Sequence, residues 1–226
     1  MARSSNRQAS DRNPRHISES TTTRLSIYLR CLTLLERSGV GTISSKDLAK
    51  QFDLNSALIR KDLAYFGDFG VRGVGYQVAE LRQQLVQILG LDRELKVIII
   101  GAGNLGLALS DYRGFNTEGC HIVGMVDNSS SKVGTASRGG VAVHHIDDLE
   151  KIVEEKRPNI AVIAVPKGVA QAVLDRVAQA GVRAILNFVP ERLRVPEGTY
   201  LRNVDLKIQV EGLAFNLARA ARPDQP

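Results

Sequence analysis

Three glycines with the spacing GxGxxG are the residues whose types and order point most directly to chemistry. They follow an apolar, β-branched run at residues 97–100 and precede a helix-like stretch at residues 107–109. In this order the first glycine permits a tight turn, the second lets backbone N–H groups approach a pyrophosphate, and the third lets the helix pack against its strand. The helix N-terminus adds unpaired N–H groups and a positive dipole end. The motif consists of Gly101, Ala102, Gly103, Asn104, Leu105 and Gly106.

A second strand, expected at residues 121–126, ends in Asp127. An acidic residue at that point can accept hydrogen bonds from an adenosine ribose and would repel a 2′-phosphate, so the pattern favours NADH and NAD⁺ as cofactors over NADPH and NADP⁺. A glycine turn kept for packing alone remains the alternative interpretation, because glycine-rich turns are common. The other candidates for the cofactor site lie at or after strand ends, at Asn128, Lys132, Pro166 and Asn187.

The composition is compatible with two small folded domains. The chain has 226 residues, of which 43% are hydrophobic, and no apolar run approaches the ~20 residues that span a bilayer. The polar N-terminus does not resemble a signal peptide. Cys31 and Cys120 lie far apart in apolar surroundings without a metal-ligand spacing, which favours buried thiols. We therefore expect a cytoplasmic protein that has neither a membrane nor a metal as partner.

The positive charge is concentrated toward the N-terminus. The net charge is +6, and residues 1–80 carry 12 Lys and Arg against 8 Asp and Glu. An excess of this kind suits a polyanionic partner such as DNA, although a solvated basic face would show the same excess.

The first third of the chain has the pattern of a winged helix-turn-helix. After a tail at residues 1–18 that we expect to be disordered, apolar periodicity and cap residues predict helices near residues 22–38, from 45, and at 56–66. The glycine-rich segment at 69–78 predicts a hairpin. In this arrangement the third helix enters the major groove of DNA and the hairpin wing reaches the backbone or the minor groove.

The candidate DNA-binding residues lie on the third helix and the wing. Arg and Lys can read guanine O6 and N7 or neutralise phosphates. A guanidinium at the tip of the wing could enter a narrow minor groove. The candidates are Ser56, Arg60, Lys61, Tyr65 and Arg72.

The rest of the chain predicts an α/β domain. A linking helix is expected at residues 81–92, after a DNA-binding domain at 19–80. Strand candidates separated by helical stretches predict a Rossmann-type, doubly wound parallel sheet within residues 93–206. These strands are expected at residues 97–100, 122–126, 141–143, 160–165 and 184–188. A final amphipathic helix and tail at 207–226 could pack on its own domain or cross to a second subunit.

Several motifs in one order resemble the Rex family of redox-sensing transcriptional repressors, over residues 24–220. The most specific is the run IRKDLAYFG at 59–67, followed by the wing RGVGY at 72–76 and the glycine motif. The pairs Asp111-Tyr112 and Asn187-Phe188 and the triplet NVD at 203–205 complete the resemblance. The order of these motifs along the chain is far more specific than any one of them.

The resemblance implies a homodimer with the C-terminal helix swapped between subunits. It implies repression at double-stranded operator DNA when the NADH/NAD⁺ ratio is low, and release when NADH binds. The family's base-reading Lys matches Lys61, and a state-dependent contact of the family matches Arg30, Tyr112 and Asp205. Leu206 stands where some members have a Phe, which leaves open any aromatic contribution at the nicotinamide.

Two other classes of protein fit parts of the pattern. An NAD-dependent dehydrogenase would need a proton-transfer group, for which the candidates are His121, His144, His145, Lys167 and Tyr112. His121 lies at the start of a strand, the wrong end of the sheet, and little chain is left for a substrate domain. The α/β half also resembles a CoA-binding domain, as in acyl-CoA synthetases, although the DNA-binding pattern argues against that function. We therefore expect a DNA-binding regulator that is not an enzyme.

Overall fold

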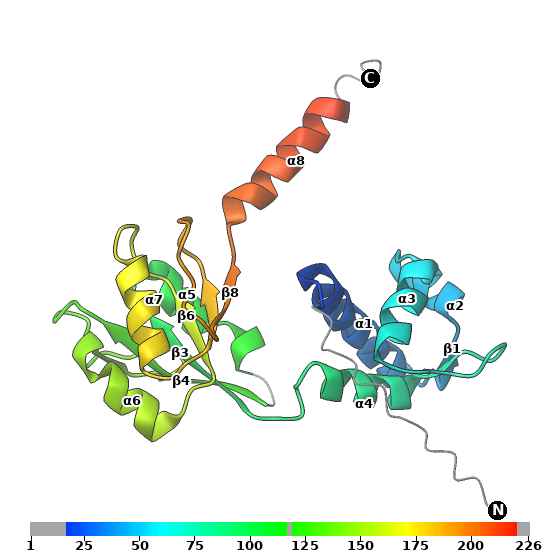
Figure 1. Cartoon of the computed structure of the whole chain (residues 1–226), viewed down its shortest axis with the longest axis horizontal. Helices are drawn as coiled ribbons and strands as arrows, with labels where there is room; N and C mark the ends of the chain where they lie inside the picture. Colours follow the sequence, from blue (N-terminus) through cyan, green and yellow to red (C-terminus); the bar gives the residue numbers. More distant parts are fainter. Residues whose placement is uncertain (1–16, 117–118, 221–226) are drawn as a thin grey trace, which may run out of the picture. The chain divides into compact units, whose positions relative to one another are not determined.

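The chain forms two compact units, residues 1–92 and 93–226 (Figure 1). The structure is a computed structural model that describes residues 17–116 and 119–220. The tail predicted at residues 1–18 therefore lies almost wholly outside the described residues. Its last residue, Ser18, caps the first helix by accepting a hydrogen bond from the backbone N–H of Thr21. No helix within the described ranges is long and apolar enough to cross a membrane.

The first unit is built from helices with short polar caps. Ser44 accepts a hydrogen bond from Asp47 N, and Asn55 accepts two, from Ala57 N and Leu58 N, so the sequence fixes where the second and third helices begin. The elements are α1 (Glu19–Arg37), β1 (Thr42–Ile43), α2 (Ser45–Phe52), α3 (Ser56–Phe66), β2 (Tyr76–Gln77) and α4 (Val78–Ile88).

One apolar core holds these helices together. It buries Leu25, Leu32 and Leu35 of α1 against Leu48 of α2 and Ile59 of α3. Burial of several such side chains contributes about 2 kcal/mol each before the entropy of ordering the chain is subtracted. The core fixes the orientation of α3, the helix that carries the candidate DNA-binding residues.

Two sequence expectations for this unit need correction. The wing at residues 69–78 is not a regular hairpin, because β2 pairs antiparallel with β1 and the wing itself forms one isolated bridge, Val71 to Gly75. The glycines within it take positive φ and turn the chain too tightly for a longer ladder. The segment at 81–92 forms helix α4, but this helix buries Leu81 and Leu85 in the first core and is not a separate linker.

The second unit contains a six-stranded parallel sheet in the order β5-β4-β3-β6-β7-β8. This is the strand order of a dinucleotide-binding doubly wound fold, with its switch point between β3 and β6. The elements are β3 (Leu95–Ile100), α5 (Asn104–Ser110), β4 (Cys120–Asp127), β5 (Val143–His145), α6 (Leu149–Lys156), β6 (Ile160–Ile163), α7 (Ala170–Gln179), β7 (Ala184–Asn187), β8 (Tyr200–Asn203) and α8 (Leu206–Ala220), with single 3₁₀ turns at Arg113–Phe115 and Ile146–Asp148.

Alternation along β3 explains the two cores of this unit. Ile98 and Ile100 pack with apolar side chains of α6 and α7 on one face, whereas Val97 and Ile99 pack on the other face with Leu107 of α5. A sheet covered on both faces requires strands that are apolar throughout, which is why this run contains no polar residue after Lys96.

Two strands differ from the prediction. The strand expected at residues 141–143 is instead Val143–His145, because Ala142 forms an antiparallel bridge with Ala136 while Val143 begins the parallel pairing with β4. The sequence analysis also missed β8, which pairs with β7 at the exposed edge of the sheet. Helix α8 follows it directly and buries none of its residues in the described structure (Figure 1).

Candidate cofactor and DNA-binding sites

A cavity of about 630 Å³ opens at the carboxyl ends of β3, β4 and β6. This is the end of a parallel sheet at which ligands bind, and the volume is within the usual range for a small-molecule site. Most of the residues predicted for the cofactor line it, namely Gly101, Gly103, Asn104, Leu105, Asp127, Asn128, Lys132 and Pro166.

The three motif glycines differ in what requires them. Gly101 has φ of +105°, and a Cβ there would meet Ala164 O at 2.5 Å, so the turn itself needs glycine. A Cβ on Gly106 would overlap Gly101 O, so helix packing needs glycine. Gly103 has φ of −81° and open space beside it. Nothing within the described chain requires glycine at this position, whereas a phosphate approaching the N-terminus of α5 would. The cavity therefore fits a dinucleotide pyrophosphate.

Asp127 is buried at the end of β4, with 7% of its surface exposed. Burial opposes its ionisation, but hydrogen bonds from Ser129 N, Lys132 Nζ and Ala102 N together hold the pKa of Asp127 below its usual range. The carboxylate is thus ionised at neutral pH. Its two oxygens have about four acceptor positions, so one remains for a ligand hydroxyl. The same carboxylate ties the glycine turn to the loop after β4.

Three predicted cofactor residues do not line the cavity. Ala102 and Gly106 are buried. Asn187 is 1% exposed, and its side-chain amide bonds to Val189 and to Asn203 Oδ1, which holds the loop after β7. Sequence reasoning missed part of the apolar wall, which is formed by Ile146, Val165, Val169 and Val173. Ile146 and Val165 come just after strands β5 and β6, whereas Val169 lies at the start of α7 and Val173 lies within it.

In the first unit, the helical period separates the predicted DNA-binding residues into two faces of α3. Lys61 and Tyr65, four residues apart, are both exposed. Ser56 and Arg60 share another face, on which Arg60 donates a hydrogen bond to Ser45 Oγ at 3.0 Å. Arg60 and Lys61 are therefore adjacent in sequence but lie on different faces of α3.

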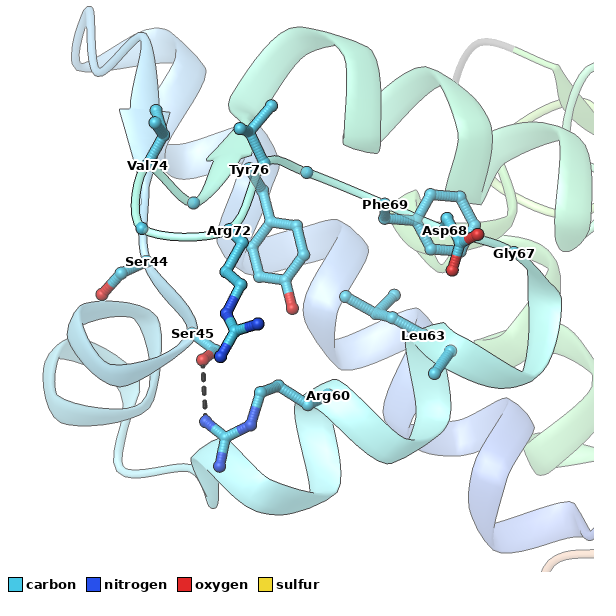
Figure 2. Close-up of a pocket in the computed structure, with 15 residues that line it drawn as sticks. Ser44, Ser45, Arg60, Leu63, Gly67, Asp68, Phe69, Arg72, Val74 and Tyr76 are labelled. Carbon is cyan, nitrogen blue, oxygen red and sulfur yellow. Dashed lines mark hydrogen bonds between the residues drawn. The ribbon is translucent and has the colours of Figure 1, made fainter.

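Arg60 faces a hollow of about 530 Å³ between α3, the wing and the first turn of α2. Figure 2 shows Arg72 extending from the wing into this hollow, toward the bonded pair of Arg60 and Ser45. The Tyr76 hydroxyl points into the same space.

The inner face of α3 carries Asp62, which is 5% exposed. Arg24 of α1 donates to both of its oxygens, at 2.6 and 2.8 Å, and Tyr28 donates at 3.0 Å. The Arg24 hydrogen bonds lower the pKa of Asp62 against the opposing effect of burial, and burial together with Asp62 raises the pKa of Tyr28 to about 12. This network fixes α3 against α1.

Known proteins resemble this chain over nearly its whole length. Residues 16–64 match the family model described as "Putative DNA-binding protein N-terminus", and residues 92–191 match the model "CoA binding domain". The redox-sensing transcriptional repressor Rex of Carboxydothermus hydrogenoformans is 48% identical over 90% of this chain and 97% of its own length. The chain belongs to the Rex family of redox-sensing transcriptional repressors.

Solved structures of RSP, a Rex-family repressor, share the fold. The structure in complex with β-NAD⁺ and operator DNA has a TM-score of 0.85 and 36% identity, covering 91% of this chain and 94% of that chain. The complex with β-NADH has a TM-score of 0.80 and 34% identity, covering 91% and 96%. The predicted fold class, a winged-helix unit followed by a Rossmann-type domain, is confirmed. The swap of the last helix is not tested by these similarities.

The three residues matched to the Rex switch lie in different surroundings. Tyr112 is 59% exposed and packs edge-to-face on Phe115 at 5.6 Å between ring centroids. Asp205 precedes α8 and accepts a hydrogen bond from Lys207 N at 2.9 Å, which caps that helix. Arg30 is exposed on α1, in the other unit.

The residues considered for a dehydrogenase are scattered. His121 lies at the start of β4, and His145 caps the 3₁₀ turn after β5 by accepting a hydrogen bond from Asp147 N. Lys167 alone of the five lines the cavity.

The Rex relatives are named as transcriptional repressors. Within residues 17–116 and 119–220, no cluster of three or more His, Cys, Asp or Glu could hold a metal ion.

Proposed function

We propose that this Rex-family repressor binds its operator through α3 and the wing, and that NADH bound in the cavity of the second unit releases it. The observation that carries the proposal is that one chain holds both a helix-turn-helix with an exposed Lys61 and a cavity whose open Gly103 fits a pyrophosphate. RSP, which has one structure in complex with NAD⁺ and operator DNA and another in complex with NADH, supports this pairing of ligands.

In the cofactor site, we assign each group a role by its position. The glycine turn and the N-terminus of α5 hold the pyrophosphate. Asp127 accepts a hydrogen bond from the adenosine ribose, and Asn128 and Lys132 lie at the same end of the cavity. Because Lys132 pairs with Asp127 at 3.0 Å, its cation offsets part of the repulsion that Asp127 alone would exert on a 2′-phosphate. Lys132 thus limits the preference for NADH over NADPH.

On the DNA side, Lys61 reads a base edge, and Ser56, Arg60, Tyr65 and Arg72 contact the backbone or the minor groove. The working protein is a homodimer, since α8 exposes large apolar side chains that a second copy would cover. These side chains are Leu206, Ile208, Val210, Leu213, Phe215 and Leu217, each at least 60% exposed. The dimer acts in the cytoplasm and turns over no substrate.

In the switch, we propose that Tyr112 and Asp205 exchange partners when the reduced nicotinamide ring enters, and that Arg30 carries this change to the winged helix. Asp205 caps α8 at its first turn, so a new partner for this carboxylate would change the start of the dimer helix. Asp205→Ala should uncouple NADH from DNA release and leave the dimer intact. An Asp205→Ala protein that still released DNA at the wild-type NADH concentration would contradict this relay.

The test of the proposed function is a mobility-shift selection from random duplex DNA, repeated with NADH, NAD⁺ and NADPH. We expect one palindromic sequence to be retained with NAD⁺ and lost with NADH. Lys61→Ala should lose specific binding, since a base contact is worth roughly 1–3 kcal/mol, and should bind NADH normally. Wild-type operator affinity in Lys61→Ala would refute the assignment of α3, and a steady turnover of NADH by wild-type protein would favour an enzyme.

A further inference from the structure

The hollow beside α3 contains the hydroxyl of Tyr76, which has no role in the DNA contacts proposed so far. The ring of Tyr76 belongs to the core of the first unit, and only 8% of the residue is exposed. Its hydroxyl forms no hydrogen bond within the part of the chain that the structure describes, and it points into the hollow (Figure 2). Burial raises the pKa of Tyr76, partly offset by the Arg60 charge, so the hydroxyl is protonated and can donate a hydrogen bond.

The charges around this hydroxyl favour an anion. Arg60 reaches the hollow from α3 and Arg72 from the wing, and the positive end of α2 begins at Ser45. The single acidic side chain in the lining, Asp68, lies beside Phe69 at the other end of the hollow from the two arginines (Figure 2). Hydrogen-bond donors from three separate segments thus meet in one space.

Glycines bring these segments close enough to share a ligand. A Cβ on Gly75 would meet Ile43 O at 2.5 Å, and φ there is +108°. A Cβ on Gly70 would meet Gly75 O at 2.5 Å. Only glycine lets the wing approach the start of α2 so closely. The backbone therefore holds the wing close to the start of α2.

We propose that a backbone phosphate of the operator occupies this hollow and accepts hydrogen bonds from the Tyr76 hydroxyl and the Arg60 guanidinium. The proposal rests on the proposed function and deepens it by assigning to Tyr76, a residue of the first core, a direct contact with DNA. A phosphate held between α2, α3 and the wing fixes the register of α3 in the groove, since phosphate contacts orient a protein on the duplex while base contacts give specificity.

The experiment pairs protein variants with chemically modified DNA. The duplex selected by the wild-type protein with NAD⁺ is synthesised as a set, each member carrying a neutral methylphosphonate in place of the phosphate at the same position of both half-sites. Tyr76→Phe keeps the core ring and should weaken binding of the unmodified duplex about tenfold, as expected for a hydrogen bond to a charged group. On the one duplex in which the contacted phosphate is neutral, the affinity lost in Tyr76→Phe should shrink to about twofold or less.

Two further variants make the result specific. Arg60→Met should also weaken binding of the unmodified duplex, and this weakening should shrink on the same methylphosphonate duplex, because both side chains would contact one phosphate. Tyr200→Phe removes the same atom from an exposed side chain of the second unit and should bind every duplex as the wild-type protein does. Thermal unfolding of each variant checks that the first unit is folded, and Arg60→Met tests the proposal even if Tyr76→Phe is unstable.

Unchanged operator affinity in Tyr76→Phe would overturn the proposal, as would an equal loss on every duplex of the set. A free-phosphate site is distinguished by heating the proteins with inorganic phosphate. If phosphate raised the melting temperature of the wild-type protein but not of Tyr76→Phe, while both bound operator equally, the hollow would hold a free anion and the proposal would fall. If the wild-type protein selected no duplex at all, the proposed function would fail with it.

Discussion

Asp62 in the first unit and Asp127 in the second are both buried carboxylates that accept three hydrogen bonds, one or more from a cation. Their donors differ. Asp62 is held by two side chains of α1, whereas Asp127 is held by two backbone N–H groups and Lys132. Asp62 joins two helices, and Asp127 joins two loops at the mouth of a cavity. Two similarly buried carboxylates therefore differ in role: Asp62 stabilises helix packing in one unit, and Asp127 supports ligand binding in the other.

The comparison predicts the largest loss of stability from Asp62→Ala. Removing one partner of a buried pair leaves the other charge uncompensated, and we expect the free energy of unfolding of the first unit to fall by about 3 kcal/mol. Operator binding should weaken with it, while NADH binding to the second unit should not change. Urea unfolding followed beside an NADH titration measures both. Tyr28→Phe, which removes a single neutral donor, is the control and should cost about 1 kcal/mol.

Two glycines of the motif show the same contrast between a residue needed for packing and a residue needed for the ligand. Gly106→Ala should destabilise the second unit by about 2 kcal/mol, because its Cβ overlaps Gly101 O and backbone must move. Gly103→Ala should leave stability unchanged within about 0.5 kcal/mol, since the added Cβ meets no atom.

For NADH binding we expect the opposite order, with Gly103→Ala causing the larger loss. Gly103→Ala should lose at least about tenfold in NADH affinity because the methyl group occupies the path of the pyrophosphate. Calorimetric titration with NADH measures this loss, and thermal unfolding measures the stability of both variants. Normal NADH binding by Gly103→Ala would mean that the open space beside this residue is not the phosphate site.

Asp127→Asn should act mainly on the ligand. Asn retains one acceptor but loses the charge that pairs with Lys132, so we expect NADH affinity to fall about tenfold and the preference for NADH over NADPH to narrow. The matched variant Lys132→Met should widen that preference, because it removes the cation nearest to a 2′-phosphate. Titration of each variant with both cofactors tests this pair, and unchanged preferences in both would remove these residues from the ribose site.

The smallest expected effect is the dependence of stability on acid. The pKa of both aspartates lies below the usual 3.8 in the folded protein. The stability that their ionisation contributes is therefore complete above the unfolded pKa and is lost as the pH falls through the folded pKa. Between pH 5 and about pH 2 the wild-type protein should lose more unfolding free energy than Asp62→Asn, in urea unfolding at each pH. If the unfolding free energies of the two proteins fell in parallel with pH, the ionised Asp62 would contribute nothing to stability.

The sequence predicted those features that depend on local patterns. The cap residue Ser44 predicted the start of α2, and the apolar run before Gly101 predicted β3, because both patterns depend on neighbours within a few residues. The edge strand β8 was missed because only Leu201 of its four residues is half-buried, so no alternating pattern marks it.

The candidate sites show the same limit. The glycine turn and Asp127 were predicted because strand order places them at one edge of the sheet. The sequence could not show that Asn187 bonds to Asn203, since that partner comes from the missed strand. Nor could it show that Arg72 turns toward Arg60, because residues from two elements meet there only in the folded unit.

We propose that binding to the two units is thermodynamically linked, so that cofactor and operator each weaken the binding of the other. Linkage requires both effects to have the same magnitude. The most direct measurement is the dissociation constant of NADH with and without saturating operator, set beside that of the operator with and without saturating NADH. We predict that both constants rise by the same factor, and that NAD⁺ gives a factor near one. An NADH affinity unaffected by the operator would show that the two sites bind independently and that NADH does not release the DNA.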